Sequence, residues 1–389
     1  ESPSWYETGH NNWTKIMGGD GMQIQIDNRD NNIVYTGLQF GNYYRLDLLN
    51  NERKSIKPKH KLGDSPLRFN WQTPILISPH NQDIIYFGSN KLHRSFNKGD
   101  DWEEISKDLT SGGKKGNVPY GTITSFDESN FQFGKLIVGS DDGIVSISID
   151  SGKTWKSVSD NLPPDLWVSR VIFSKHEKNT IYLSLNGYRY NDFKPYIYVS
   201  NDNGYSWENI SSNLPLSPVN VIREDINRKE ILYVGTDNGL FISFNSGKKW
   251  HPFESSLNRV AVHDLVIQNE KNDLLVGTHG RSIYKTNLDL FNDFMIEKNG
   301  EKPLIIFEIN DLRHSNSWGK RSNYSDDVFK SSVKTIVYSD KSIIYDYTIT
   351  DNFNNILNKG KLNLDKGFNN IEIMPMINYS IATKKLKKI

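Results

Sequence analysis

Three carboxylates in this sequence stand where an acid or a base could act on a substrate. Asp20 lies in the glycine-rich turn 18–21, and Glu224 and Asp264 lie in two later segments that read as strands. Hydrolysis of a glycosidic bond needs two carboxyl groups about 5–10 Å apart, so Asp20 with either partner, or with one outside this chain, would meet that need. The simpler interpretation is that Asp20 stabilises its turn, and the sequence leaves both open.

A second group of side chains is suited to binding a ligand at one opening. Arginine presents a rigid fork of N–H donors that fits a carboxylate. The alternative, which we favour, is that these charges pair with one another between neighbouring structural units. The ligand-binding candidates are Trp71, Trp167, Arg170, Arg189, Arg223, His263, His279 and Arg281.

A repeated eight-residue motif reveals the elements that must position these side chains. The pattern S-x-[DN]-x-G-x-x-W occurs at 95–102, 148–155, 200–207 and 243–250. Asp or Asn bonds its own backbone and Gly supplies a positive φ, so the motif predicts a tight turn followed by a buried indole. Its structural residues are Asn97, Trp102, Asp150, Trp155, Asp202, Trp207, Asn245 and Trp250. No acidic residue stands where a calcium loop needs its bidentate ligand, so we expect no metal here.

The spacing of the motif predicts an all-β fold. Tryptophans that recur every 43–53 residues, with several short strands between them, are typical of β-propeller blades. Six units are visible, with inner strands that begin near residues 21, 69, 120, 168, 219 and 262. We expect a seventh blade to be completed by a segment upstream of residue 1. In such a propeller, function would belong to the mouth of the central channel.

The alternation of apolar residues changes rhythm towards the end of the chain. Residues 1–12 read as an entry loop, 13–290 as the propeller and 291–327 as a linker. Alternating segments separated by Asp, Asn and Gly turns then predict a small β-sandwich-like domain over 328–389.

The composition excludes several functional classes. The 389 residues carry a formal net charge of +1, which gives no support to a nucleic-acid partner. The chain has no cysteine, so thiolate metal sites and disulfides are absent. No apolar run approaches the length of a membrane span, and we expect no cofactor.

Several motifs together resemble a known family. The repeat is similar to the Asp-box (BNR) repeat of sialidases, xyloglucan-active glycoside hydrolases and the sortilin-type luminal propeller. The segments 18–21, 69–71, 77–80, 167–170, 220–225, 263–265 and 278–281 resemble the second half of exported bacterial proteins known as sortilin-like or BNR-repeat glycosyl hydrolases. The likeness covers about residues 13–375 and implies a further propeller upstream. The Phe-Arg-Ile-Pro signature of sialidases is absent, the nearest segment being 67–70.

This resemblance implies a site and a cellular location. Xyloglucan-active relatives place a carboxylate in a glycine-rich loop near the start of their second propeller, which points to Asp20. We expect an exported bacterial protein at the cell surface, outer membrane-associated or extracellular. It would be a binding or scaffold module that engages a protein or glycan partner at its channel face. The alternative is a glycoside hydrolase whose cleft is shared with the upstream propeller of the same precursor.

Overall fold

The computed structural model describes residues 14–116, 118–253, 257, 259–289, 291, 303–307, 309, 332–351, 353–374, 378 and 380. The chain divides into two compact units, Glu1–Glu224 and Asp225–Ile389. The predicted entry loop and most of the predicted linker lie outside the described residues. The described residues form strands joined by turns, with a short 3-10 helix, η1 (Tyr188–Tyr190), so the all-β prediction is confirmed.

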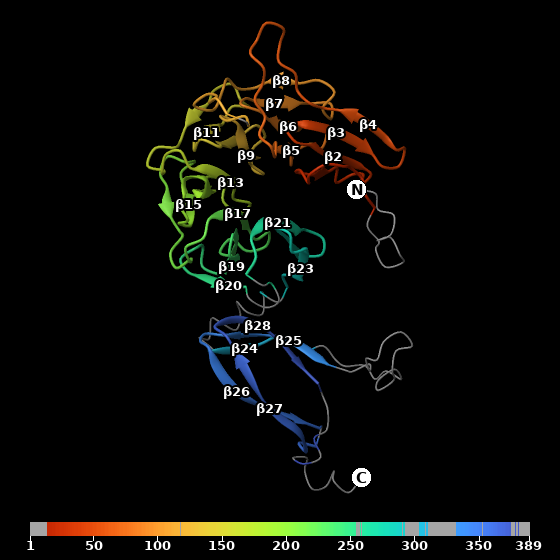
Figure 1. Ribbon diagram of the computed structural model, residues 1–389, viewed down its shortest axis with the longest axis vertical. Helices are drawn as coiled ribbons and strands as arrows, with labels where there is room; N and C mark the ends of the chain where they lie inside the picture. Colours follow the sequence, from red (N-terminus) through yellow and green to blue (C-terminus); the bar gives the residue numbers. More distant parts are fainter. Residues whose placement is uncertain are drawn as a thin grey trace. The chain divides into compact units, whose positions relative to one another are not determined.

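The first unit contains four antiparallel sheets of four strands, each in chain order across the sheet. Figure 1 shows them following one another from red to green. The strands are β1 (Gln25–Ile26), β2 (Ile33–Leu38), β3 (Asn42–Asp47) and β4 (Glu52–Ser55); β5 (Ile75–Ile77), β6 (Ile85–Gly88), β7 (Leu92–Ser95) and β8 (Glu103–Glu104); β9 (Ile123–Glu128), β10 (Leu136–Ser140), β11 (Val145–Ser148) and β12 (Lys156–Ser157); β13 (Trp167–Phe173), β14 (Ile181–Asn186), β15 (Tyr196–Ser200) and β16 (Glu208–Asn209). The unit ends with β17 (Val219–Glu224).

The sheets are the blades that the repeat predicts. The first strands of successive sheets lie against one another, with β9 in contact with β13, and β13 with β17. Neighbouring sheets approach closely at glycines in the second strands: a Cβ on Gly139 would come within 2.2 Å of Val168, and one on Gly88 within 3.1 Å of Ile123. This close approach explains why the second strands repeat the pattern of apolar residues followed by Gly.

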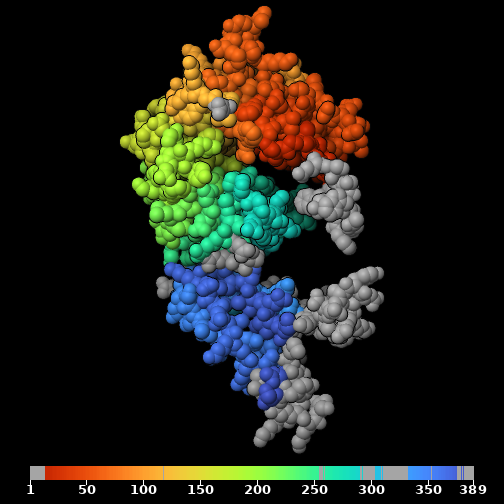
Figure 2. All heavy atoms as spheres, viewed as in Figure 1, coloured from red at the N-terminus to blue at the C-terminus, as the bar shows by residue number. Residues whose placement is uncertain are grey.

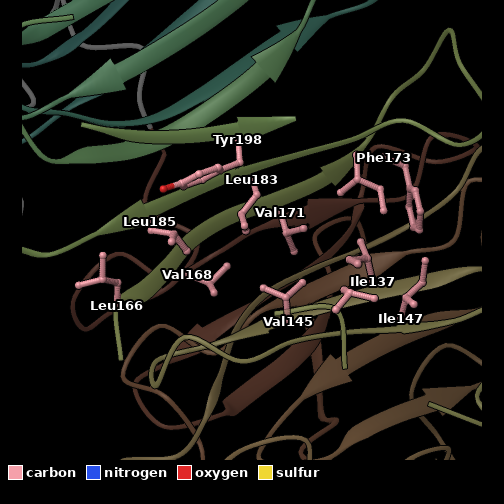
Figure 3. Close-up of a cluster of buried hydrophobic side chains, with 12 residues drawn as sticks. Ile137, Val145, Ile147, Leu166, Val168, Val171, Phe173, Leu183, Leu185 and Tyr198 are labelled. Atoms are coloured by element: carbon pink, nitrogen blue, oxygen red, sulfur yellow. The ribbon is translucent and has the colours of Figure 1, made fainter. Parts of the chain in front are cut away.

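The core of the first unit is divided into layers between successive sheets. One layer joins the third and fourth sheets, where Ile137 and Val145 face Val168, Val171 and Leu183 (Figure 3). Similar layers lie between the first and second sheets and between the second and third. The second and third sheets therefore bury both faces against their neighbours. In the fourth sheet, β14 is buried along its whole length.

The second unit begins with two antiparallel sheets. β18 (Leu232–Thr236), β19 (Gly239–Ser243) and β20 (Trp250–Pro252) pair in chain order, and so do β21 (Val262–Gln268), β22 (Asp273–Thr278) and β23 (Ile283–Asn287). A bulge between Val262 and Asp264 interrupts the β21–β22 register. Among the described residues, the third strand of this last sheet has no fourth strand beside it.

The remaining strands form a three-stranded sheet and a hairpin. The sheet has the order β24 (Leu304–Ile306), β25 (Val333–Ser339) and β28 (Gly367–Ile373), and the hairpin pairs β26 (Ile343–Thr350) with β27 (Ile356–Leu364). Val337, Leu364 and Ile371 form their shared core, as a small sandwich requires. β24 falls within the segment that the sequence assigns to a linker. Its short apolar run is a strand because it pairs with β25.

An aromatic cluster joins these C-terminal strands to the rest of the second unit. Phe368 is 1% exposed, and its ring centroid lies 6.0 Å from that of Phe244, 6.0 Å from that of Phe253 and 5.6 Å from that of Phe291. The rings of Tyr338 and His251 add a further edge contact at 5.8 Å. The three-stranded sheet is therefore packed into the second unit by aromatic contacts.

The connection between β4 and β5 projects from the surface of the first unit. Its residue Leu62 is fully exposed, and the projection is visible at the top of Figure 2. Within the described part of the chain, no helix has the length and apolar character needed to cross a membrane.

Candidate functional site

A single pocket is lined by the first strands of the first unit. It has a volume of about 230 Å³ and takes residues from β1, β5, β9, β13 and β17. Strands that are far apart in sequence thus surround one axis, as blades must. We call this the channel pocket; its polar residues include Gln25, Asp127, Arg170, Lys175 and Arg223. Arg170 and Arg223, both predicted as ligand-binding residues, are brought together here.

Asp127, which was not predicted from the sequence, carries the most perturbed carboxyl of the channel pocket. Burial raises the pKa of Asp127 to about 6, although hydrogen bonds from backbone N–H groups and the positive charges of Arg223 and Lys175 oppose the rise. Its Oδ2 accepts a bond of 2.9 Å from the N–H of Phe173. Aligning the ends of the inner strands would have found it, since Asp127-Glu128 occupies the place of Arg223-Glu224.

Glu224, a catalytic candidate from the sequence, is a buried tie between sheets. It is 2% exposed and accepts hydrogen bonds from the Ser174 hydroxyl at 2.8 Å, the Lys175 N–H at 2.5 Å and the Tyr182 hydroxyl at 3.2 Å. Burial raises the pKa of Glu224. Because both of its oxygens accept these hydrogen bonds, the carboxylate connects β17 to the preceding sheet.

Glu128 makes the same tie two sheets earlier. The hydroxyls of Ser78 and Tyr86 donate to it at 2.5 and 2.8 Å, and the N–H of Gly134 donates at 2.7 Å. The Ser–Glu and Tyr–Glu separations in sequence are 50 and 42 residues in both ties. The arrangement therefore belongs to the repeat and not to one catalytic centre.

A second candidate surface is formed where inner strands begin; we call it the strand-start face and define it by Trp71, Tyr120, Trp167, Arg189 and Tyr190. A buried hydrogen-bond chain supports it. Asn70 donates to the Thr122 hydroxyl at 2.9 Å, and Thr122 donates to Asp141 at 2.6 Å. Burial raises the pKa of Asp141, which is held by two further backbone N–H groups.

The most specific contact on the strand-start face is a stacked pair. The guanidinium carbon of Arg189, on η1, lies 3.9 Å from the centroid of the Trp167 ring, at the start of β13. Desolvation lowers the pKa of Arg189. The η1 turn is positioned by the side chain of Asn186: its Oδ1 accepts the N–H of Tyr188 at 2.9 Å, and its Nδ2 donates to Oδ1 of Asn220 at 2.9 Å.

Aromatic rings are exposed around this pair. Tyr190 is 51% exposed and Trp71 45%, and Trp71 packs edge-on against Phe40 with centroids 5.1 Å apart. The Lys114 ammonium lies 4.3 Å from the centre of the Tyr120 ring. The phenols of Tyr120 and Tyr190 lie side by side and share a hydrogen bond. Burial and this bond raise the pKa of Tyr120. Rigid rings in the open are suited to stacking against a ligand.

Asp20 lies on the exposed loop before β1. Gln39 donates a hydrogen bond to its Oδ2, and the preceding Gly19 has a φ of +85°. The loop is thus a turn that depends on glycine, and the carboxylate at its tip faces solvent. Glu224, the other catalytic candidate in the first unit, already accepts hydrogen bonds from Ser174, Lys175 and Tyr182.

The remaining predicted residues lie on the second unit. The rings of His263 and His279 are 5.0 Å apart at an angle of 36°. Burial lowers the pKa of His263, and the charge of His279 lowers it further. Asp264 accepts the N–H of Leu265 at 2.9 Å, and Arg281 is exposed before β23.

The motif residues hold their turns in the way that the pattern predicts. Asp150 accepts the N–H and hydroxyl of Thr154 at 2.9 and 2.6 Å and the hydroxyl of Ser148 at 2.9 Å. Asp202 repeats these bonds with Ser200 and Ser206. Asn97 and Asn245 accept the equivalent hydroxyls of Ser95 and Ser243.

The motif tryptophans also connect neighbouring sheets. The indole N–H of Trp155 donates to the carbonyl of Ile105 at 2.8 Å, and that of Trp207 to the carbonyl of Val158 at 2.8 Å. Trp250 is 1% exposed. The Trp102 ring is packed in the core between the first two sheets, but its N–H has no partner among the described residues. Nor do the described residues gather three metal-ligating side chains at any point.

Comparison with known proteins supports the family resemblance. Residues 195–386 match the family described as "Sortilin, neurotensin receptor 3" (Sortilin-Vps10). The vacuolar protein sorting/targeting protein PEP1 of Saccharomyces cerevisiae is 31% identical over 99 residues, which are 25% of this chain and 5% of the yeast protein. The chain therefore spans only a small part of the curated relatives that it matches.

Two of the solved structures that resemble this chain are an enzyme and an extracellular domain. The GH74 xyloglucanase of Xanthomonas campestris is 14% identical with a TM-score of 0.48, covering 69% of this chain and 52% of the enzyme. The extracellular domain of a hybrid two-component system from B. thetaiotaomicron is 14% identical with a TM-score of 0.47, covering 90% of this chain and 39% of that one.

Proposed function

We propose that this sortilin-like Asp-box protein is a recognition module that binds a protein or glycan partner on the strand-start face of its propeller. The observation that carries the proposal is the Arg189–Trp167 stack among exposed aromatic rings. Large rings that are held rigidly lose little conformational entropy when a ligand covers them. The buried chain from Asn70 through Thr122 to Asp141 holds the loops beneath.

The proposal extends to the setting of the module. We place it on an exported bacterial protein, at the cell surface, outer membrane-associated or extracellular, as part of a longer precursor with an upstream propeller. The match to the Sortilin-Vps10 family supports a secreted or surface location. Its partners would then be a component of a surface complex or an external glycan.

A binding screen with matched variants tests this proposal. The full-length protein is screened against immobilised polysaccharides and surface proteins, and each ligand found is titrated by calorimetry. The double variant Trp167→Ala/Arg189→Ala should weaken binding by about tenfold or more, the loss of roughly 1.4 kcal/mol. Tyr205→Ala is the control, because Tyr205 is 62% exposed and also lies under a cation, Lys156, away from this face. Equal affinity of the double variant and the wild type would reject the strand-start face.

The second candidate function is glycoside hydrolysis with Asp20 as an acid. It is supported by the exposed carboxylate at the tip of a glycine turn, which a substrate could reach. The partner carboxylate would be a residue of the upstream propeller. Release of reducing sugar from a polysaccharide panel by the full-length protein, beside Asp20→Ala, tests it. Turnover that persists in the variant would remove Asp20 from the mechanism.

A further inference from the structure

A groove of about 720 Å³ runs along the outside of the first unit, between the second and third sheets. One wall is the segment after β8, from Ile105 to Thr110, and the other is β11 with its motif turn. Lys61, from the projecting β4–β5 connection, lies at its edge. The groove is separate from the strand-start face, which is built from the beginnings of the inner strands.

The lining of this groove carries more positive than negative charge. Lys61, Lys107 and Lys153 line it, all three are exposed, and none forms an ion pair with another described residue. Two acids line it as well, but Glu104 is paired with Lys91 at 2.9 Å and Asp108 with Arg68 at 2.7 Å. The two paired cations, Lys91 and Arg68, are not part of the lining. Lys61 also attracts Glu104, but it forms no ion pair with it, so all three ammonium groups can turn to a ligand. We call it the lysine groove.

The equivalent groove one sheet earlier is different. It lies between the first and second sheets, has a volume of about 560 Å³, and is lined by four basic and four acidic residues. Arg45 and Lys54 both pair with Asp100, at 2.8 and 2.9 Å. The repeat therefore produces a groove at both places, but of these two only the lysine groove is lined by more basic than acidic residues.

The walls of the lysine groove favour a ligand that is recognised by side chains. A peptide that adds as a strand needs free backbone groups. The N–H of Ile105 already donates to Leu92, and its carbonyl accepts the Trp155 indole. The N–H of Leu109 likewise donates to Asn90. What remains is the partly exposed ring of Trp155 and the three ammonium groups, with the hydroxyl of Ser106, which accepts the N–H of Leu92 at 2.8 Å and can still donate.

We propose that the lysine groove binds an acidic polysaccharide. The ammonium groups of Lys61, Lys107 and Lys153 contact carboxylates of successive uronic acid residues, and a sugar ring lies against the indole of Trp155. Lysine suits this role because its charge is compact and its long side chain adapts to a flexible chain. The groove volume is that of an ordinary ligand site and holds several sugar rings.

Titration of the full-length protein with polygalacturonate tests this proposal. Binding is expected at low salt and should weaken as salt screens the lysines. The variant Lys61→Gln/Lys107→Gln/Lys153→Gln should bind about tenfold more weakly or not at all. The control Lys178→Gln/Lys341→Gln/Lys366→Gln makes the same change of net charge at exposed positions outside the groove, and it should bind like the wild type.

Three results would overturn the proposal. One is no binding of polygalacturonate at low salt. Another is an equal loss in both triple variants, which would mean attraction by net charge alone. The third is tighter binding of polyglutamate than of polygalacturonate, which would make an acidic polypeptide the occupant. Circular dichroism and melting temperature verify that the variants are folded, and single substitutions of Lys107 and Lys153 replace the triple variant if it is not.

Discussion

Asp127 makes the stability of the first unit depend on pH. Its pKa is about 6 in the folded protein, against 3.8 for an ordinary aspartate, so the folded state retains a proton that the unfolded chain has released between about pH 4 and pH 6. Stability therefore falls as the pH rises through this window. Asp127→Asn removes the titration and should gain on the order of 2 kcal/mol relative to the wild type between pH 4 and pH 7.

Urea unfolding at several pH values measures this effect. Asp160→Asn, at an exposed aspartate, is the control and should keep the slope of the wild type. Parallel pH profiles for Asp127→Asn and the wild type would contradict the assignment.

Glu224 and Glu128 are expected to be structural residues of equal weight. Glu224→Ala leaves the Ser174 hydroxyl, the Lys175 N–H and the Tyr182 hydroxyl without their acceptor, which should cost about 2–4 kcal/mol in the free energy of unfolding. Glu128→Ala should cost a similar amount. Chemical denaturation compares both with Glu208→Ala, at an exposed position. A stable but inactive Glu224→Ala protein would instead favour a catalytic role.

The motif tryptophans can be separated by what their N–H groups do. Trp155→Phe removes the bond to the Ile105 carbonyl and should lower the free energy of unfolding by about 1 kcal/mol. Trp102→Phe should be nearly neutral, because that indole N–H is buried without a partner among the described residues. Urea titration of the two variants gives the comparison, and an equal cost would mean that ring volume alone matters.

At the scale of elements, the repeat was sufficient to predict most of the architecture. The turn chemistry of Asp150 and Asp202 is local, so it follows from five or six neighbouring residues. β24 was assigned to a linker because its short run shows too little alternation by itself. It is a strand because residues about thirty positions later, in β25, pair with it.

The candidate site was less predictable, because it depends on contacts between distant segments. Trp167 and Arg189 were both singled out, yet their stacking requires the turn that Asn186 fixes. Arg170 and Arg223 meet in the channel pocket only because β13 and β17 belong to successive blades. Asp127 was overlooked because its raised pKa arises from burial, which no local pattern reveals.

At the scale of the whole molecule, Phe368 should control how the C-terminal strands are held in the second unit. Phe368→Ala removes a ring that contacts Phe244, Phe253 and Phe291, and should cost about 3–5 kcal/mol. Differential scanning calorimetry should show a lower transition temperature for the second unit. Phe353→Ala, at an 85% exposed ring, should leave it unchanged. Unchanged melting of Phe368→Ala would mean that the cluster contributes little.

The ties made by Glu128, Glu224, Trp155 and Trp207 each reach only from one sheet to its immediate neighbour. The stability of such an array is approximately the sum of the contributions of each sheet and of each contact between neighbouring sheets. Pulled from its two ends, the first unit should come apart blade by blade. A force–extension trace would then display a series of evenly spaced peaks in place of a single rupture.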